Sequence, residues 1–188
     1  AVGFNARAMV FPPSFQFVQA ASGNGIAVLS EVEFNKNNQI VYAGEYGPSI
    51  SLDINIFGNT PLQNPLLSGE GVFIVWSNTE TNTLDGIVEG SGITITDMAV
   101  GNGEDVYVTG TYAGLGATQA SIGSTNLSFA PSVNNNAFIA KLGRTQGGSF
   151  DTLWVYTPNQ GADYISSYLF VEFDSINDGV VLGGTVNF

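Results

Sequence analysis

The sequence contains no cysteine and no histidine. The chain therefore has no disulfide framework, no thiolate or imidazole ligand for zinc, and neither the thiolate nucleophile nor the imidazole base of common hydrolases. Positive charge is also scarce, because four Lys and Arg residues stand against sixteen Asp and Glu residues, which gives a net charge of −12. We expect no nucleic-acid partner, since a surface of this sign repels phosphate groups.

Long apolar runs are missing as well. No run approaches the roughly 20 residues of a membrane-spanning helix, so we expect no membrane insertion. The sequence starts with Ala1 rather than Met, which favours an exported chain that has lost its signal peptide. Only 11% of the residues are charged and 24 are glycine, a composition typical of secreted β-proteins. These features predict an extracellular or cell-surface location.

Alternation of apolar and polar residues is the main pattern that is present. In residues 49–56, for example, Ile50, Leu52, Ile54 and Ile56 alternate with polar residues, as in a half-buried strand. Gly, Asn, Pro, Ser and Thr interrupt almost every apolar stretch before it reaches helical length. The sequence therefore predicts an all-β fold. The predicted strands are residues 15–20, 25–34, 40–45, 49–56, 71–77, 86–89, 93–100, 106–112, 126–129, 137–142, 152–156, 164–173 and 180–186.

Clusters of Asn, Asp and Gly separate several of these strands and tolerate the left-handed backbone of tight hairpins. Around three of the clusters the flanking residues match, which predicts three copies of one hairpin that each end on a glycine. The copies are residues 31–44, 97–110 and 170–183. Two other elements recur, because residues 71–76 match 136–141, aligning Phe73 with Phe138, and residues 56–62 match 122–127.

Three segments carry a resemblance to a known family. They are Ala137-Phe-Ile-Ala-Lys-Leu142, Leu153-Trp154 and Val106-Tyr-Val-Thr-Gly-Thr111. They resemble the SBBP-type β-propeller repeat of exported bacterial and archaeal proteins, and the likeness runs from about Phe15 to the C-terminus. It implies that the segments are antiparallel strands of propeller blades. Because a closed ring needs at least four blades, we expect three blade-like repeats in a propeller-like or sandwich arrangement that does not close.

The third repeat is predicted to be incomplete at the C-terminus, because the sequence ends five residues after Gly183. An unassigned strand lies at the other end, ahead of Pro12-Pro13. In it Val2, Phe4, Ala6, Ala8 and Val10 share one face. We therefore divide the chain into an exchangeable N-terminal strand, residues 1–11, and a single all-β repeat domain, residues 12–188.

An open apolar strand is a template for strand addition, and Val180, Leu182 and Val186 mark the predicted acceptor edge. Pairing within one molecule would give a monomer, whereas pairing between molecules would propagate into a filament. We predict a non-catalytic structural subunit that assembles with copies of itself by β-strand donation into a filament or surface coat. The alternative is a propeller-like binding module that recognises a glycan or a cell-surface protein.

Few residues suggest chemistry. Asp174, Asn177 and Asp178 are candidate calcium ligands, because Ca²⁺ takes oxygen ligands, but an ordinary hairpin turn requires the same residue types. No other cofactor is expected. The one N-glycosylation sequon makes Asn126 a candidate modification site.

Two carboxylate pairs, Glu31 with Glu33 and Glu172 with Asp174, each share a strand face. Such pairs could serve a glycosidase if they flanked a sugar-binding cleft. Nothing in the sequence indicates a cleft, and we predict no enzymatic activity.

Overall fold

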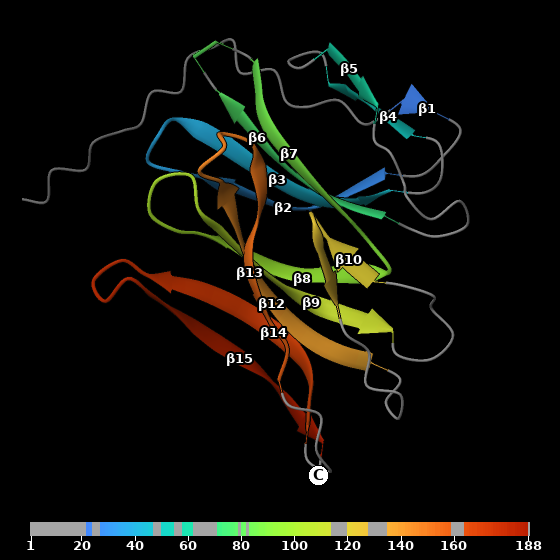
Figure 1. Ribbon diagram of the computed structural model, residues 1–188, viewed down its shortest axis with the longest axis vertical. Coiled ribbons are helices and arrows are strands. Elements are labelled where there is room, and N and C mark those ends of the chain that lie inside the picture. The colour runs from blue at the N-terminus through green and yellow to red at the C-terminus, as the bar shows by residue number, and fades with distance from the viewer. Residues whose placement is uncertain are drawn as a thin grey trace, which may run out of the picture.

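The computed structural model describes residues 22–23, 27–46, 50–54, 58–61, 71–78, 80–81, 83–113, 120–127, 135–158 and 164–187. All regular secondary structure in these residues is β-strand, which confirms the predicted all-β class (Figure 1). The strands are β1 (Ser22–Gly23), β2 (Ala27–Phe34), β3 (Gln39–Tyr46), β4 (Ile50–Ile54), β5 (Gly58–Pro61), β6 (Gly71–Asn78), β7 (Thr83–Ser91), β8 (Ile93–Val100), β9 (Val106–Ala113), β10 (Ala120–Ile122), β11 (Thr125–Leu127), β12 (Asn135–Arg144), β13 (Phe150–Tyr156), β14 (Tyr164–Asp174) and β15 (Gly179–Asn187). Among the described residues, no helix is long and apolar enough to cross a bilayer.

These strands form four antiparallel sheets. The largest has six strands in the order β11-β10-β7-β6-β3-β2, and the next has four in the order β13-β12-β9-β8. A two-stranded sheet consists of β14 and β15, and a small three-stranded sheet has the order β1-β4-β5. The predicted strand at residues 15–20 lies outside the described residues.

The three predicted hairpin copies are confirmed as β2–β3, β8–β9 and β14–β15. A β-bulge interrupts the first strand of each at an equivalent place, and the extra residues are Ser30, Thr96 and Leu169. The strand β14 has a second irregularity at Ser166. Equivalent bulges in three hairpins show that the copies share backbone geometry as well as sequence. We call β2, β3, β6 and β7 the first repeat, β8, β9, β12 and β13 the second, and β14 and β15 the third.

The third and fourth strands of the first two repeats also correspond. Phe73 on β6 lies opposite Gly44, and Phe138 on β12 lies opposite Gly110, as the sequence match predicts. At Gly110 a Cβ atom would meet the Phe138 ring at 2.7 Å. Glycine therefore makes room for the aromatic ring of the next strand.

The third hairpin departs from the alignment in one respect. Gly44 and Gly110 lie opposite Leu29 and Ile95, the residues that precede the bulges. In the third hairpin the equivalent residue, Tyr168, lies opposite Gly184. The alignment of Gly183 with the other two glycines is therefore wrong by one position, because the third turn is one residue longer.

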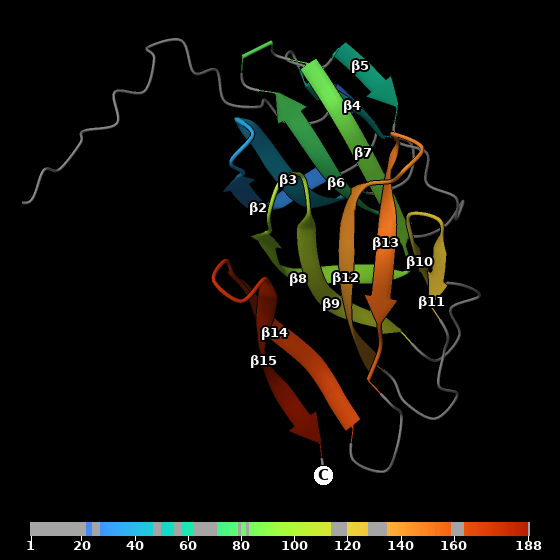
Figure 2. The same cartoon turned by 60° about the vertical axis from the view of Figure 1, so that its left-hand side comes forward.

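The repeats are stacked face to face. The four-stranded sheet lies between the six-stranded sheet and the β14–β15 hairpin (Figures 1 and 2). Alternate residues of the middle sheet point in opposite directions, so that Val106, Val108 and Phe138 enter the first core, while Tyr107 and Ile139 enter the second.

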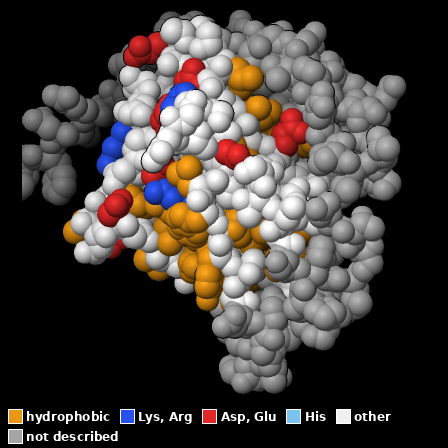
Figure 3. Space-filling view, in the orientation of Figure 1, with side chains coloured by type: hydrophobic (Ala, Val, Ile, Leu, Met, Phe, Trp, Pro, Cys, Tyr) orange, Lys and Arg blue, Asp and Glu red, His pale blue; other side chains and the backbone are white. Residues whose placement is uncertain are grey.

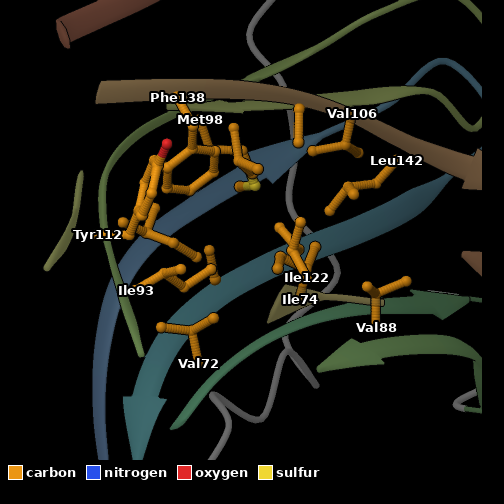
Figure 4. Close-up of a cluster of buried hydrophobic side chains, with 14 of the residues drawn as sticks. Val72, Ile74, Val88, Ile93, Met98, Val106, Tyr112, Ile122, Phe138 and Leu142 are labelled. Carbon is orange, nitrogen blue, oxygen red and sulfur yellow. The ribbon is translucent and has the colours of Figure 1, made fainter. Parts of the chain in front are cut away.

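Among the described residues the first core contains more buried side chains than the second. In Figure 4 side chains from both sheets point toward one another, with Val72, Ile74 and Val88 on one side and Met98 and Leu142 on the other. The second core joins the middle sheet to Tyr168 and Val171 of β14, with Phe173, Val180 and Leu182 packed against it. The third repeat is thus attached through one face.

Candidate assembly surface and acidic groove

The third repeat has two described strands where each of the others has four. Within the described part of the chain β15 pairs with β14 alone, whereas β3 and β9, its counterparts, each pair with a further strand, β6 or β12. The side chains of Val180 and Leu182 face the middle sheet and are partly buried there. The structure thus places these two predicted acceptor residues on an edge strand, and Val186 lies on the same strand.

The outer face of the third hairpin carries exposed apolar side chains together with the exposed Glu172. Phe170 is 47% exposed and Val181 is 54% exposed, and the bulged residue Leu169 is exposed beside them. Figure 3 shows hydrophobic side chains gathered over the region where Figure 1 draws β13, β14 and β15. Exposed apolar groups that gather on one face mark an interaction site more often than scattered ones do.

The face of the four-stranded sheet that packs against the third hairpin keeps exposed aromatic side chains on β13. Between the six-stranded and four-stranded sheets β13 packs against β7, so the fourth strand of the second repeat covers the fourth strand of the first. Between the four-stranded sheet and the third hairpin, β14 packs on β8, β9 and β12. Trp154 and Tyr156 on β13 remain 42% and 55% exposed. We call the β15 edge, Phe170, Val181, Trp154 and Tyr156 the assembly surface.

Two adjacent residues of β8 connect the second repeat to the third. The Thr96 hydroxyl donates a hydrogen bond to the carbonyl oxygen of Tyr168 at 2.8 Å, and the Val171 amide donates one to Asp97 Oδ2 at 2.7 Å. Leu169 and Phe170 occupy the equivalent positions in the third repeat. The positions that form a polar connection in the second repeat are therefore apolar and exposed in the third.

A groove of about 310 Å³ lies where the first strands of the three repeats converge. Its lining includes Glu33 from β2, Asp97 from β8 and Glu172 from β14, together with Phe34 and Phe173. The structure therefore does contain a cleft, which the sequence did not indicate. It brings Glu33 together with Glu172, whereas Asp174 is not among the lining residues.

Partial burial and like charge raise the pKa values of two glutamates of β2, of which Glu33 lines the groove. Partial burial, followed by the carboxylates of Asp97 and Glu33, raises the pKa of Glu31 above its ordinary value. Partial burial, with Glu172 and Asp97, raises the pKa of Glu33 in the same way. The lining carries Glu33, Asp97 and Glu172 against Lys36, so the groove is acidic on balance and attracts cations. Sequence reasoning missed Asp97, although its alignment with Glu31 in the repeat was the available signal.

The calcium candidates are engaged in the third turn. Asp174 Oδ1 accepts hydrogen bonds from the amides of Ile176 and Asn177, and Asn177 Nδ2 donates to Asp174 Oδ2 at 2.6 Å. These bonds, the side-chain bond from Asn177 first, lower the pKa of Asp174. Asp178 has a positive φ of 50° and accepts a hydrogen bond from Asn102 Nδ2. Turn geometry, together with one hydrogen bond from the second turn, therefore accounts for the contacts of all three residues.

No group of three or more His, Cys, Asp or Glu side chains suited to a metal ion occurs in the described residues. Asn126, the glycosylation candidate, is exposed on β11, an edge strand of the six-stranded sheet. The predicted N-terminal strand, with Val2, Phe4, Ala6, Ala8 and Val10, lies outside the described residues.

Comparisons with known proteins add no assignment. No protein-family model matches the sequence, and neither curated proteins nor solved structures give a significant match. The resemblance to the SBBP-type repeat stays a prediction.

Proposed function

We propose that this protein is a non-catalytic, extracellular or cell-surface structural subunit that assembles with copies of itself by β-strand donation. Each subunit offers the assembly surface as acceptor and residues 1–11 as donor. Because donor and acceptor are different parts of the chain, the contact is head-to-tail and extends into a filament or a surface coat.

The observation that carries this proposal is the two-stranded third repeat. Its apolar inner face is already seated on the middle sheet, and its edge strand, β15, has β14 as its one strand partner in the described residues. An edge strand of nine residues is a ready template for another strand. Main-chain hydrogen bonds along β15 would supply affinity, and alternate apolar side chains would supply specificity.

The acidic groove supports a second candidate, a propeller-like binding module for a glycan or a cell-surface protein. The groove is a concave site formed by all three repeats, and its volume of about 310 Å³ suits a small ligand or one side chain of a larger partner. This candidate requires no assembly, so the oligomeric state of the purified protein separates the two proposals.

The test is negative-stain microscopy and light scattering of the full-length protein beside two variants. We expect filaments from the unaltered chain and loss of assembly in Phe4→Asp, because burying a polar group without a hydrogen bond costs on the order of 2–7 kcal/mol and an ionised carboxylate costs more. Asn5→Asp adds the same charge to the opposite face of the strand and should still assemble. Both variants should keep the β-sheet circular dichroism spectrum of the parent.

Two results would contradict the proposal. One is a full-length protein that stays monomeric at high concentration. The other is unaltered assembly after deletion of residues 1–11. The first result would leave the binding module as the better account, and the second would place the donor elsewhere in the chain.

A further inference from the structure

The third strand of each complete repeat has a fixed place and a fixed pattern. On β6 Phe73 lies opposite Gly44, and on β12 Phe138 lies opposite Gly110. In the third repeat Gly184 occupies this position on β15. Tyr168 of β14 pairs with it on one side, and none of the described strands pairs with it on the other. Among the described strands the third-strand position beside β15 is therefore unfilled, and the repeat predicts an aromatic residue opposite Gly184 at that position.

The N-terminal sequence has the pattern of this third strand. Val2-Gly-Phe-Asn-Ala-Arg-Ala8 aligns with Asn136-Ala-Phe-Ile-Ala-Lys-Leu142 of β12 without a gap. Phe and Ala are identical at two positions, the cation is kept as Arg7 for Lys141, and the final residue is apolar in both. The hydrophobic alternation of the segment gives no reason to expect Phe, Ala and a cation at these particular spacings.

We propose that residues 2–8 are the third-strand element of the third repeat and pair antiparallel with β15 of another copy, with Phe4 opposite Gly184. In this register Ala6 lies opposite Leu182, and Ala8 lies opposite Val180. The pairing between copies rests on the proposed function, whereas the register rests on the repeat.

The packing of β12 explains why this register is favoured. Phe138, Ala140 and Leu142 share one face of β12 and are buried in the first core. Residues 4, 6 and 8 would take the equivalent places in the second core, on the face of the hairpin where Val180 and Leu182 already pack. A shift by one residue would turn this apolar set to solvent and bring Asn5 and Arg7 inward.

Charge agrees with the same placement. Lys141 forms an ion pair of 2.7 Å with Asp105, close to the second turn. Arg7 would take the place of Lys141 on a hairpin whose charged side chains, Glu172, Asp174 and Asp178, are all acidic. One cation on the donated strand therefore meets a surface of opposite sign.

Disulfide trapping tests the register, because the natural chain has no cysteine. Position 7 should lie opposite position 181, as Lys141 lies opposite Tyr107. An Arg7→Cys chain mixed with a Val181→Cys chain under mild oxidation should give a linked heterodimer, identified by mass spectrometry of the joined peptides. Asn5→Cys mixed with Val181→Cys is the matched control, two residues out of register on the same face, and should link at least tenfold less.

The outcomes distinguish this inference from the proposed function. Stronger linkage from position 5 than from position 7 would overturn the register while leaving strand donation in place. Filaments that depend on residues 1–11 but give no linkage to position 181 in either mixture would overturn the choice of β15. Linkage confined to one molecule that carries both Arg7→Cys and Val181→Cys would support the register and overturn donation between copies.

Discussion

The hydrogen bonds of Thr96 and Asp97 should hold the third repeat in place, and their removal gives a measurable loss. In Asp97→Ala the amide of Val171 loses an ionised acceptor at 2.7 Å. Hydrogen bonds to charged groups contribute about 1.5–3 kcal/mol. Removing one carboxylate from the acidic groove also relieves repulsion on Glu31 and Glu33, so we expect the net loss near the lower end of this range.

The neighbouring bond is a neutral one. Thr96→Val removes the hydroxyl that donates to Tyr168 at 2.8 Å and keeps the shape of the side chain, so we expect a loss of about 0.5–1.5 kcal/mol. Thr94→Val is the control, because Thr94 is exposed on the same strand, and surface substitutions usually stay within about 0.5 kcal/mol. The losses of unfolding free energy in the two single variants should not add up to the loss in the double variant, since both bonds join the same two strands.

Denaturant unfolding and amide hydrogen exchange provide the assay. The unfolding midpoint should fall for Asp97→Ala and Thr96→Val, and the Val171 amide should exchange faster in Asp97→Ala, while core amides of the six-stranded sheet keep their protection. An unchanged midpoint together with unchanged exchange at Val171 would refute the idea that these bonds attach the third repeat.

Two further predictions concern the groove and the core. Because the pKa of Glu33 is raised above its ordinary value of 4.5, ionised Glu33 destabilises the folded state. Glu33→Gln should therefore raise the unfolding midpoint at pH 7, and the gain should vanish below about pH 4.5, where both side chains are neutral; a variant less stable at pH 7 would contradict this. Gly110→Ala should cost more than about 3 kcal/mol in denaturant unfolding, because its Cβ would collide with the carbonyl oxygen of Thr94 and the Phe138 ring, whereas Gly147→Ala, with no atom nearer than 3.6 Å, should be near neutral.

Much of the fold follows from local sequence pattern. Period-two alternation and clusters of Asn, Asp and Gly predicted the hairpins, because strand faces and tight turns depend on residues close in the chain. The alignment of Phe73 with Phe138 also predicted equivalent strands. The extra residue of the third turn, which moves Gly184 into the place predicted for Gly183, was hidden because both positions are glycine.

The sites depended more on tertiary arrangement. Val180 and Leu182 were predicted on an edge because strand order within a hairpin follows from the chain. The groove was not predicted, because it exists where β2, β8 and β14 converge from distant parts of the sequence. The repeat alignment placed Asp97 at the position of Glu31, but its contact with β14 became known only from the hydrogen bond to Val171.

The single-sided attachment of the third hairpin has a kinetic consequence. The four-stranded sheet has a core on each face, whereas β14 and β15 bury apolar side chains on one face alone among the described residues. In stacked repeats a terminal unit has one neighbour to stabilise it, so it opens with less free energy than the units inside. The hairpin should detach and reseat while the other sheets stay folded, so exchange of a bound strand need not wait for global unfolding.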